Sequence, residues 1–164
     1  MKTDSNEELY FTWWLDDLIK AGLIERYERA ESFQLSSPVK VKVAKQLKTK
    51  VKMVERHLLD GHLYTPDFVV KFDRDFAKKC KLWGFSGLCI IEIKADYDKD
   101  NMTRLFRINQ KWVWKDYGVL VNLVKIPSFF KKTFTPKRYM LTDKTMKPRR
   151  LGYKPRTLKQ FMEI

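Results

Sequence analysis

Three charged residues stand where the surrounding sequence is apolar. Asp67 follows Pro66 and precedes a Phe-Val-Val run, while Glu92 and Lys94 alternate with isoleucines at the end of a second apolar run. In an extended strand, alternate side chains point to the same face, so Glu92 and Lys94 share one face of their strand. A charge removed from water costs several kcal/mol unless it is paired or bound to a metal. The sequence therefore predicts a functional site here.

The two carboxylates suit a divalent cation. Carboxylate oxygens are hard ligands that favour Mg²⁺ or Mn²⁺, so Asp67 and Glu92 are candidate ligands for one or two such ions. The cation would stabilise negative charge on a phosphate undergoing hydrolysis, and Lys94 would orient the attacking water or help to deprotonate it. The alternative is a Glu92–Lys94 ion pair on a solvated sheet face, which an isolated Glu-x-Lys would favour.

The combination of Pro66-Asp67 with Glu92-Ile93-Lys94 resembles the PD-(D/E)xK nuclease superfamily. The resemblance implies an α/β fold with a mixed central β-sheet flanked by helices, a restriction-endonuclease-like core. It implies a Mg²⁺- or Mn²⁺-dependent phosphodiesterase, with the backbone carbonyl of Ile93 as a further metal ligand.

The N-terminal segment adds a closer resemblance. Ser5 with Glu8 three residues later forms a capping-box pattern, and an apolar helix follows it. This order resembles small phage-type endonucleases and the nuclease subunit of cut-and-paste transposases, which implies that Glu8 is an additional acid reaching the metal. Two alternatives remain: Glu7 is that acid, or Glu8 serves only as a helix cap.

Hydrophobic periodicity predicts the elements that position these residues. The 88–94 run is almost wholly apolar, which predicts a central strand. Between 73 and 87 we expect a connecting loop or hairpin. The order of elements predicts an α/β nuclease domain over 1–126 and a basic C-terminal extension over 127–164. The predicted helices cover 5–21, ending at Gly22, and 101–117, ending at Gly118; the predicted strands cover 27–35, 63–72, 88–94 and 119–126.

The net charge of +14, from 34 Lys and Arg against 20 Asp and Glu, predicts a polyanionic partner, most commonly nucleic acid. In 39–56, valines alternate with lysines, which predicts a strand edge or ribbon facing nucleic acid, with Lys42 and Lys48 as contacts; a solvated face is the alternative. The superfamily resemblance implies a polar residue from helix 101–117, either Gln110 or Lys111. Arg107 and Lys111 are four residues apart and could grip phosphates together.

Other classes of protein are disfavoured. No apolar run approaches the roughly 20 residues needed to span a bilayer, and the N-terminus lacks a secretory signal pattern. We expect a cytoplasmic protein without a membrane partner, located in the host cell if a phage encodes it. Cys80 and Cys89 form neither a disulfide framework nor a zinc pattern. The tryptophans are expected in the core: Trp13, Trp14, Trp112 and Trp114.

The sequence thus predicts a metal-dependent endonuclease acting on DNA, encoded by a phage or mobile element, with structure-selective cleavage as one option. A second copy of the chain, or a phage or transposition protein, would be its protein partner. Two alternatives use the same charge. One is a nucleic-acid-binding protein that retains the fold without the activity, and the other is a basic phage assembly protein.

Overall fold

The structure is a computed structural model that describes residues 5–97 and 101–163. The chain divides into two compact units. The sheet unit consists of Met1–Ala30 and Pro66–Ile164, and the ribbon unit consists of Glu31–Thr65. The sheet unit has α/β architecture with helices flanking a mixed sheet, as the sequence predicts.

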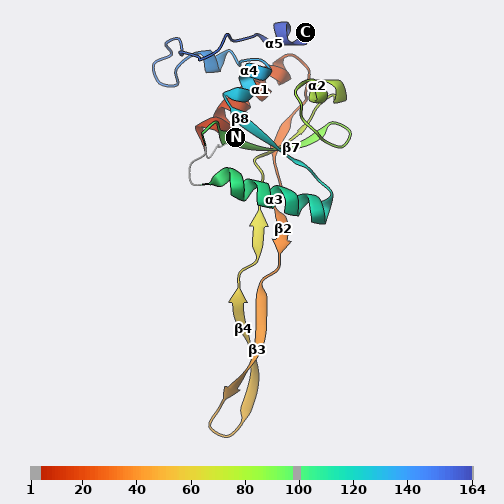
Figure 1. The fold of residues 1–164 in the computed structure, drawn as a ribbon, viewed down its shortest axis with the longest axis vertical. Helices are drawn as coiled ribbons and strands as arrows, with labels where there is room; N and C mark the ends of the chain where they lie inside the picture. Colours follow the sequence, from red (N-terminus) through yellow and green to blue (C-terminus); the bar gives the residue numbers. More distant parts are fainter. Residues whose placement is uncertain (1–4, 98–100, 164) are drawn as a thin grey trace. The chain divides into compact units, whose positions relative to one another are not determined.

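The sheet unit contains a four-stranded sheet in the order β1-β6-β7-β8 (Figure 1). Its strands are β1 (Tyr27–Arg29), β6 (Phe68–Lys71), β7 (Leu88–Ala95) and β8 (Val121–Ile126). The β1–β6 and β6–β7 pairs are antiparallel and the β7–β8 pair is parallel. The predicted central strand is confirmed, because β7 has a partner on each side and is buried along most of its length.

Helix α1 (Asn6–Lys20) begins where the sequence predicts, with the Ser5 side chain accepting from the backbone N–H of Glu8 at 3.1 Å. It ends at Lys20, and the chain turns away two residues later at the left-handed Gly22, with φ of +69°. Its apolar stripe includes the fully buried Phe11 and Trp14. The Phe11 and Phe68 rings lie 5.7 Å apart, so this helix covers the sheet face that carries Phe68 of β6.

Helix α3 (Met102–Tyr117) follows β7 and ends at Gly118, which has φ of +64°. It buries Phe106, Asn109 and Val113, and the Gln110 side chain donates to the Val121 carbonyl of β8. The exposed Trp114 corrects the prediction that all four tryptophans lie in the core, because its ring packs on the partly exposed Trp83, 5.7 Å away, and not in the core cluster. Among the described residues, no helix is both long and apolar enough to cross a membrane.

The segment after β8 packs into the sheet unit. Its short helices are α4 (Ser128–Lys132), η1 (Arg138–Met140) and α5 (Leu158–Met162). Phe130, Phe134 and Phe161 are all buried in the same core cluster as Trp14. The predicted basic extension belongs to one compact unit with α1 and the four-stranded sheet. Its lysines are exposed while its phenylalanines are buried.

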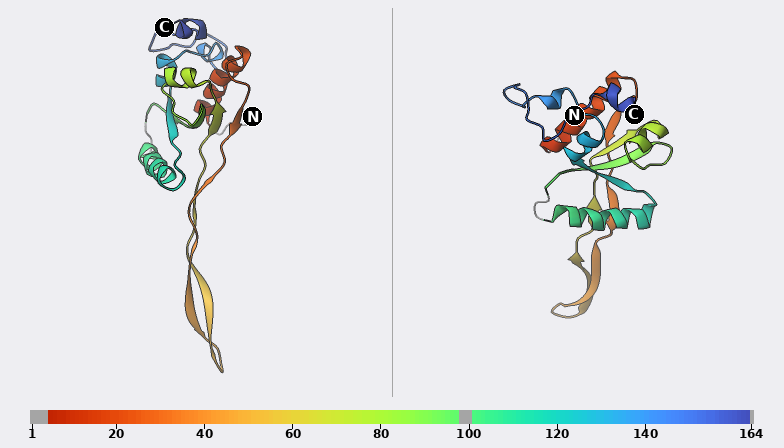
Figure 2. Two further views of the ribbon diagram at one scale, coloured as in Figure 1. Left: turned by 90° about the vertical axis from the view of Figure 1, so that its right-hand side faces the viewer. Right: turned by 45° about the horizontal axis from the view of Figure 1, so that its top comes forward.

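The ribbon unit consists of two antiparallel strand pairs. The pair β3 (Val39–Gln46) with β4 (Val51–Leu59) forms a hairpin, and β2 (Phe33–Ser36) pairs with β5 (His62–Tyr64). The hairpin strands twist around each other, as two-stranded ribbons do (Figure 2). The ribbon predicted from the valine–lysine alternation is therefore present.

Three predicted elements were wrong. The single strand expected over 27–35 is two strands, β1 and β2, which belong to different sheets. The strand expected over 63–72 is interrupted at Pro66 and Asp67, because proline has no N–H to donate to a ladder. The loop expected over 73–87 contains the helix α2 (Arg74–Lys79), which starts where the Asp73 side chain accepts from two backbone N–H groups.

Candidate active site

Asp67 is held at the point where β6 begins. Its backbone N–H donates to the Ile91 carbonyl at 3.0 Å, and its carboxylate Oδ2 accepts from the Ile93 N–H at 2.6 Å. Because β6 starts one residue later, at Phe68, the Ile93 N–H of β7 meets the Asp67 carboxylate in place of a strand carbonyl. This bond fixes the carboxylate against the middle of β7.

Glu92 and Lys94 lie side by side on β7. The Lys94 Nζ atom is 2.6 Å from Glu92 Oε1, with side chains 24% and 8% exposed respectively. The expected ion pair therefore exists, but it is not on a solvated face. In the register of the parallel pair, Glu92 is next to Leu123 and Lys94 is next to Lys125. Two lysines thus adjoin on neighbouring strands beside a buried carboxylate.

Glu8 does more than cap its helix. It lies in the first turn of α1 and is 6% exposed. Its Oε2 atom is 2.8 Å from an Arg29 guanidinium nitrogen, and Ser5 Oγ donates to its Oε1 at 3.3 Å. Arg29 comes from β1, and its guanidinium stacks 4.9 Å above the centre of the Phe68 ring. Helix α1 and strand β1 are therefore joined through this carboxylate.

The charges of Glu8 and Glu92 both act on the Asp67 carboxylate. The pKa of Asp67 is raised to about 7. Burial is the largest cause and the negative charges of Glu92 and Glu8 add to it, while the Ile93 N–H and Lys94 lower it. Between the two acids left open by the sequence, Glu8 is the one whose charge acts on Asp67. Crowding of carboxylates in a partly dry environment is typical of a functional site.

The donor set fits a hard divalent cation, whose charge would relieve the repulsion among these carboxylates. In their present positions, however, no three His, Cys, Asp or Glu side chains of the described residues form a metal-binding group. Arg29 and Lys94 hold oxygens of Glu8 and Glu92, so a cation would have to compete with them. The structure brings the N–H of Ile93 to Asp67, whereas the prediction for this residue concerned its carbonyl.

The residues predicted to contact the substrate do not lie at one site. Arg107 of α3 lines a cavity of about 320 Å³ together with Lys125 of β8 and Lys132 of α4. Gln110 bridges structural groups, because it accepts from Arg107 at 2.9 Å and donates to the Val121 carbonyl at 2.6 Å. Lys111 lines a different cavity, of about 450 Å³, beside two partly exposed tryptophans.

The remaining predicted contacts, Lys42 and Lys48, belong to the ribbon unit, where Lys42 is on β3 and Lys48 is in the turn. They lie in a different compact unit from the carboxylates.

Sequence reasoning missed Arg29, Lys125 and Lys132. A partner for Glu8 could have been expected because a buried acid needs a cation, but its position on β1 depends on the β1–β6 pairing. Lys125 carried a readable signal, since it interrupts the apolar strand β8 much as Lys94 interrupts β7. No local pattern distinguishes Lys132 from its basic neighbours.

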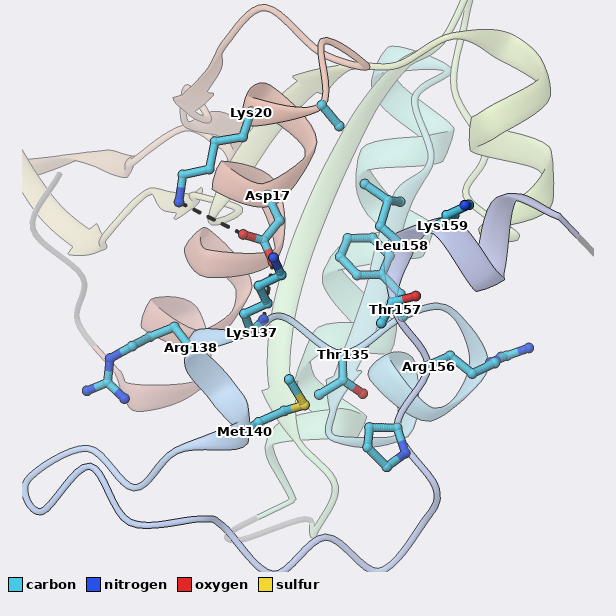
Figure 3. A pocket seen from close by; sticks show the side chains of 13 residues that line it. Asp17, Lys20, Thr135, Lys137, Arg138, Met140, Arg156, Thr157, Leu158 and Lys159 are labelled. Carbon is cyan, nitrogen blue, oxygen red and sulfur yellow. Dashed lines mark hydrogen bonds and ion pairs between the residues drawn. The ribbon is translucent and has the colours of Figure 1, made fainter.

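A larger pocket, of about 700 Å³, lies elsewhere in the sheet unit (Figure 3). It lies beside the C-terminal end of α1, nine residues or about 13 Å along the helix from Glu8. Its one carboxylate, Asp17, is 4.0 Å from Lys20 Nζ and accepts from the Lys137 backbone N–H at 3.2 Å. This pocket has no carboxylate cluster, so the smaller, buried group around Asp67 is the better candidate for chemistry.

No family model matches the chain, and neither a curated protein nor a solved structure matches it. The case for a function therefore rests on the geometry of its own residues. That geometry consists of Glu8, Asp67 and Glu92 in a largely buried group, with Lys94 and Lys125 beside them on the sheet.

Proposed function

We propose that this protein is a metal-dependent endonuclease of the PD-(D/E)xK type that hydrolyses phosphodiester bonds in DNA. One observation carries the proposal. Glu8 on α1 and Glu92 in the middle of β7 both act by charge on Asp67 at the start of β6, and burial together with these charges raises the pKa of Asp67 to about 7. A fold gains no stability from such repulsion, so a function in which a cation joins the group accounts for it.

Glu8, Asp67 and Glu92 would hold the cation, Mg²⁺ or Mn²⁺. When bound, this ion supplies Lewis-acid stabilisation of charge on the scissile phosphate and lowers the pKa of a coordinated water. The Ile93 N–H keeps the Asp67 carboxylate in one orientation. Arg29 pairs with Glu8 and is itself held in place by its contact with the Phe68 ring.

Lys94 would serve the attacking water. An ammonium group has three N–H donors, and one of them points at Glu92 Oε1. The others can hold a water, or a non-bridging phosphate oxygen, next to the carboxylates. Lys125 adjoins Lys94 and lines a cavity with Arg107 and Lys132, a set of cations that suits a phosphate. These residues would position the DNA backbone for attack.

A second candidate is a DNA-binding protein without cleavage activity. Two ion pairs favour it: Glu8 pairs with Arg29 and Glu92 pairs with Lys94. Two of the three carboxylates are therefore already neutralised by basic side chains. In that case the group would stabilise the sheet unit, and added Mg²⁺ or Mn²⁺ would leave its melting temperature unchanged.

The test is cleavage of a substrate panel (supercoiled plasmid, linear duplex, four-way junction, single strand and RNA) with Mg²⁺ or Mn²⁺ and with EDTA. Asp67→Asn and Glu92→Gln should each abolish cleavage, a loss of at least about 10³-fold. Glu8→Gln should also impair cleavage, whereas its neighbour Glu7→Gln, with the same change of charge, should cleave as the wild type does. Equal activity of the Glu8 and Glu7 variants would remove Glu8 from the site. Absence of cleavage on every substrate would favour the second candidate.

A further inference from the structure

The hairpin of β3 and β4 exposes nearly all of its side chains. Within the register, Val43 faces Val54 and Lys45 faces Lys52, and both pairs are on the same face. Val51 and Met53 are more than half exposed. A two-stranded hairpin with so little burial is marginal by itself in water, so a binding partner would account for its composition.

Four lysines gather at the tip. Lys45 and Lys52 are directly opposite each other, and Lys48 and Lys50 lie in the turn that the Leu47 N–H closes by donating to the Lys50 carbonyl at 2.8 Å. Like charges placed opposite each other destabilise a strand pair. None of these four lysines has an ion-pair partner among the residues that the structure describes. The tip therefore carries about four unneutralised positive charges.

The other end of the same hairpin mixes acids with its basic residues. The Lys40 Nζ atom is 3.9 Å from Glu55 Oε2, and His57 Nε2 is 2.9 Å from Asp60 Oδ1. Solubility alone would be served by mixed charges along the whole hairpin. Concentration of unpaired lysines at the tip instead indicates that the tip contacts a polyanion.

We propose that the tip of the β3–β4 hairpin enters the major groove of duplex DNA. This rests on the proposed function for the identity of the polymer as DNA. The major groove of B-form DNA is wide enough for a two-stranded β-ribbon. A strand of eight residues spans about 26 Å, which is enough to cross the groove and reach phosphates on both of its walls. The exposed Val51 and Met53 can contact thymine methyl groups there.

Two other nucleic acids fit less well. The major groove of A-form RNA is deep and narrow, and protein side chains do not read it. Single strands are bound on aromatic platforms, and the 39–59 segment contains no Phe, Tyr or Trp. The chemistry of this hairpin therefore favours double-stranded DNA.

The test is binding without cleavage, measured by fluorescence anisotropy in EDTA over a range of salt concentrations. The tip variant replaces Lys45, Lys48, Lys50 and Lys52 by Gln. The matched control removes four exposed cations from the sheet unit (Lys20, Arg26, Lys78 and Lys81 to Gln), so that the net charge changes equally. On duplex DNA the tip variant should bind at least about tenfold more weakly, and the slope of log affinity against log salt should fall by about 3 to 4. The control should change the slope by less than 1.

The groove is tested with modified DNA. Duplex DNA whose cytosines carry glucosylated hydroxymethyl groups at C5 has a crowded major groove, so the wild type should lose affinity on it and the tip variant should not. The wild type should bind duplex RNA of the same sequence weakly. The tip variant and the matched control should change that affinity equally.

Several results would overturn the proposal. These are an unchanged salt slope in the tip variant, no response to glucosylation, and a loss of affinity of the tip variant for duplex RNA as large as its loss for duplex DNA. Conversion of a dimeric wild type into a monomer by the tip substitutions would also do so, because the hairpin would then be an association arm. The binding assay needs no catalysis. A protein that passes it and fails every cleavage assay would retain this inference and lose the proposed nuclease activity.

Discussion

The carboxylate group of the sheet unit and the lysine tip of the ribbon unit use charge in opposite ways. Around Asp67, the charges are largely buried, and those of Glu92, Glu8 and Lys94 act on the pKa of Asp67, so changing one of them alters its protonation. At the tip, each lysine is exposed and separated from acids, and its contribution to binding should add to the rest. Cleavage and DNA affinity are thus expected to be lost through different substitutions, cleavage around Asp67 and affinity at the tip. The following predictions test that separation.

The largest effect is expected at Lys94. If it holds the attacking water, Lys94→Ala should lower the single-turnover cleavage rate by about 10²–10⁴, the range for a positioned proton-transfer group. DNA affinity should change little. Lys78→Ala, which removes an exposed lysine elsewhere in the sheet unit, serves as the control. A wild-type rate in the Lys94 variant would reduce this residue to the ion-pair partner of Glu92.

The second contrast concerns stability. Phe161 is buried against the Phe76 and Phe134 rings, so Phe161→Ala should cost about 3–5 kcal/mol of unfolding free energy. Met53→Ala on the exposed hairpin should cost less than about 0.5 kcal/mol. Thermal or urea denaturation measures both. An equally small effect at Phe161 would mean that the C-terminal segment does not contribute to the core.

The third prediction follows from the pKa of Asp67. The folded pKa of about 7 exceeds the ordinary aspartate value of 3.8, so the folded protein retains a proton that the unfolded chain has released between these values. Stability from this group is therefore full below about pH 4 and is lost as pH rises through about 7. At about 1.4 kcal/mol per pKa unit, Asp67→Asn should gain up to about 4 kcal/mol over the wild type at pH 8, and little at pH 4.

The same melting curves test the cation. Because binding requires an ionised Asp67, Mn²⁺ should raise the melting temperature of the wild type more at pH 8 than at pH 5.5. Asp67→Asn should show no such difference. A parallel pH dependence of the two proteins without metal would contradict the raised pKa.

A more modest effect than that at Phe161 is expected at Arg29. Replacing it with Gln leaves the buried Glu8 without its guanidinium, which should destabilise the sheet unit by about 1–3 kcal/mol. Because Arg29 is itself one-third exposed, the cost should stay at the lower end of that range. The double variant with Glu8→Gln should recover part of the loss. A double-mutant cycle with no coupling would show that the pair acts independently.

The sequence predicted the parts of the fold that depend on local periodicity. The two long helices and the central strand β7 were identified because their apolar residues repeat over many positions. The ribbon was identified because valines alternate with lysines over a whole strand. Element boundaries failed around Pro66 and after Ala30, where the chain passes between the two units and no periodicity marks the change.

Of the residues in the candidate site, only the acids and Lys94 were predicted from the sequence. Glu92 and Lys94 were visible because an apolar strand makes a charge conspicuous. Arg29 and Lys125 join the group through strand pairing, β1 with β6 and β7 with β8. Pairing depends on contacts between distant parts of the chain, which residue spacing does not encode. The burial of Phe161 likewise required the folded core, because its neighbours in sequence are basic and exposed.

The hydrogen bond from the Ile93 N–H to the Asp67 carboxylate gives the protein a built-in spectroscopic probe. The chemical shift of an amide proton depends strongly on the charge of the oxygen that it faces, and this amide faces one oxygen of one titrating group at 2.6 Å. In a ¹⁵N-labelled sample, the Ile93 cross-peak should therefore move as Asp67 ionises near pH 7. A cation arriving at the carboxylate should move it again, so a single resonance would follow both events without substrate or turnover.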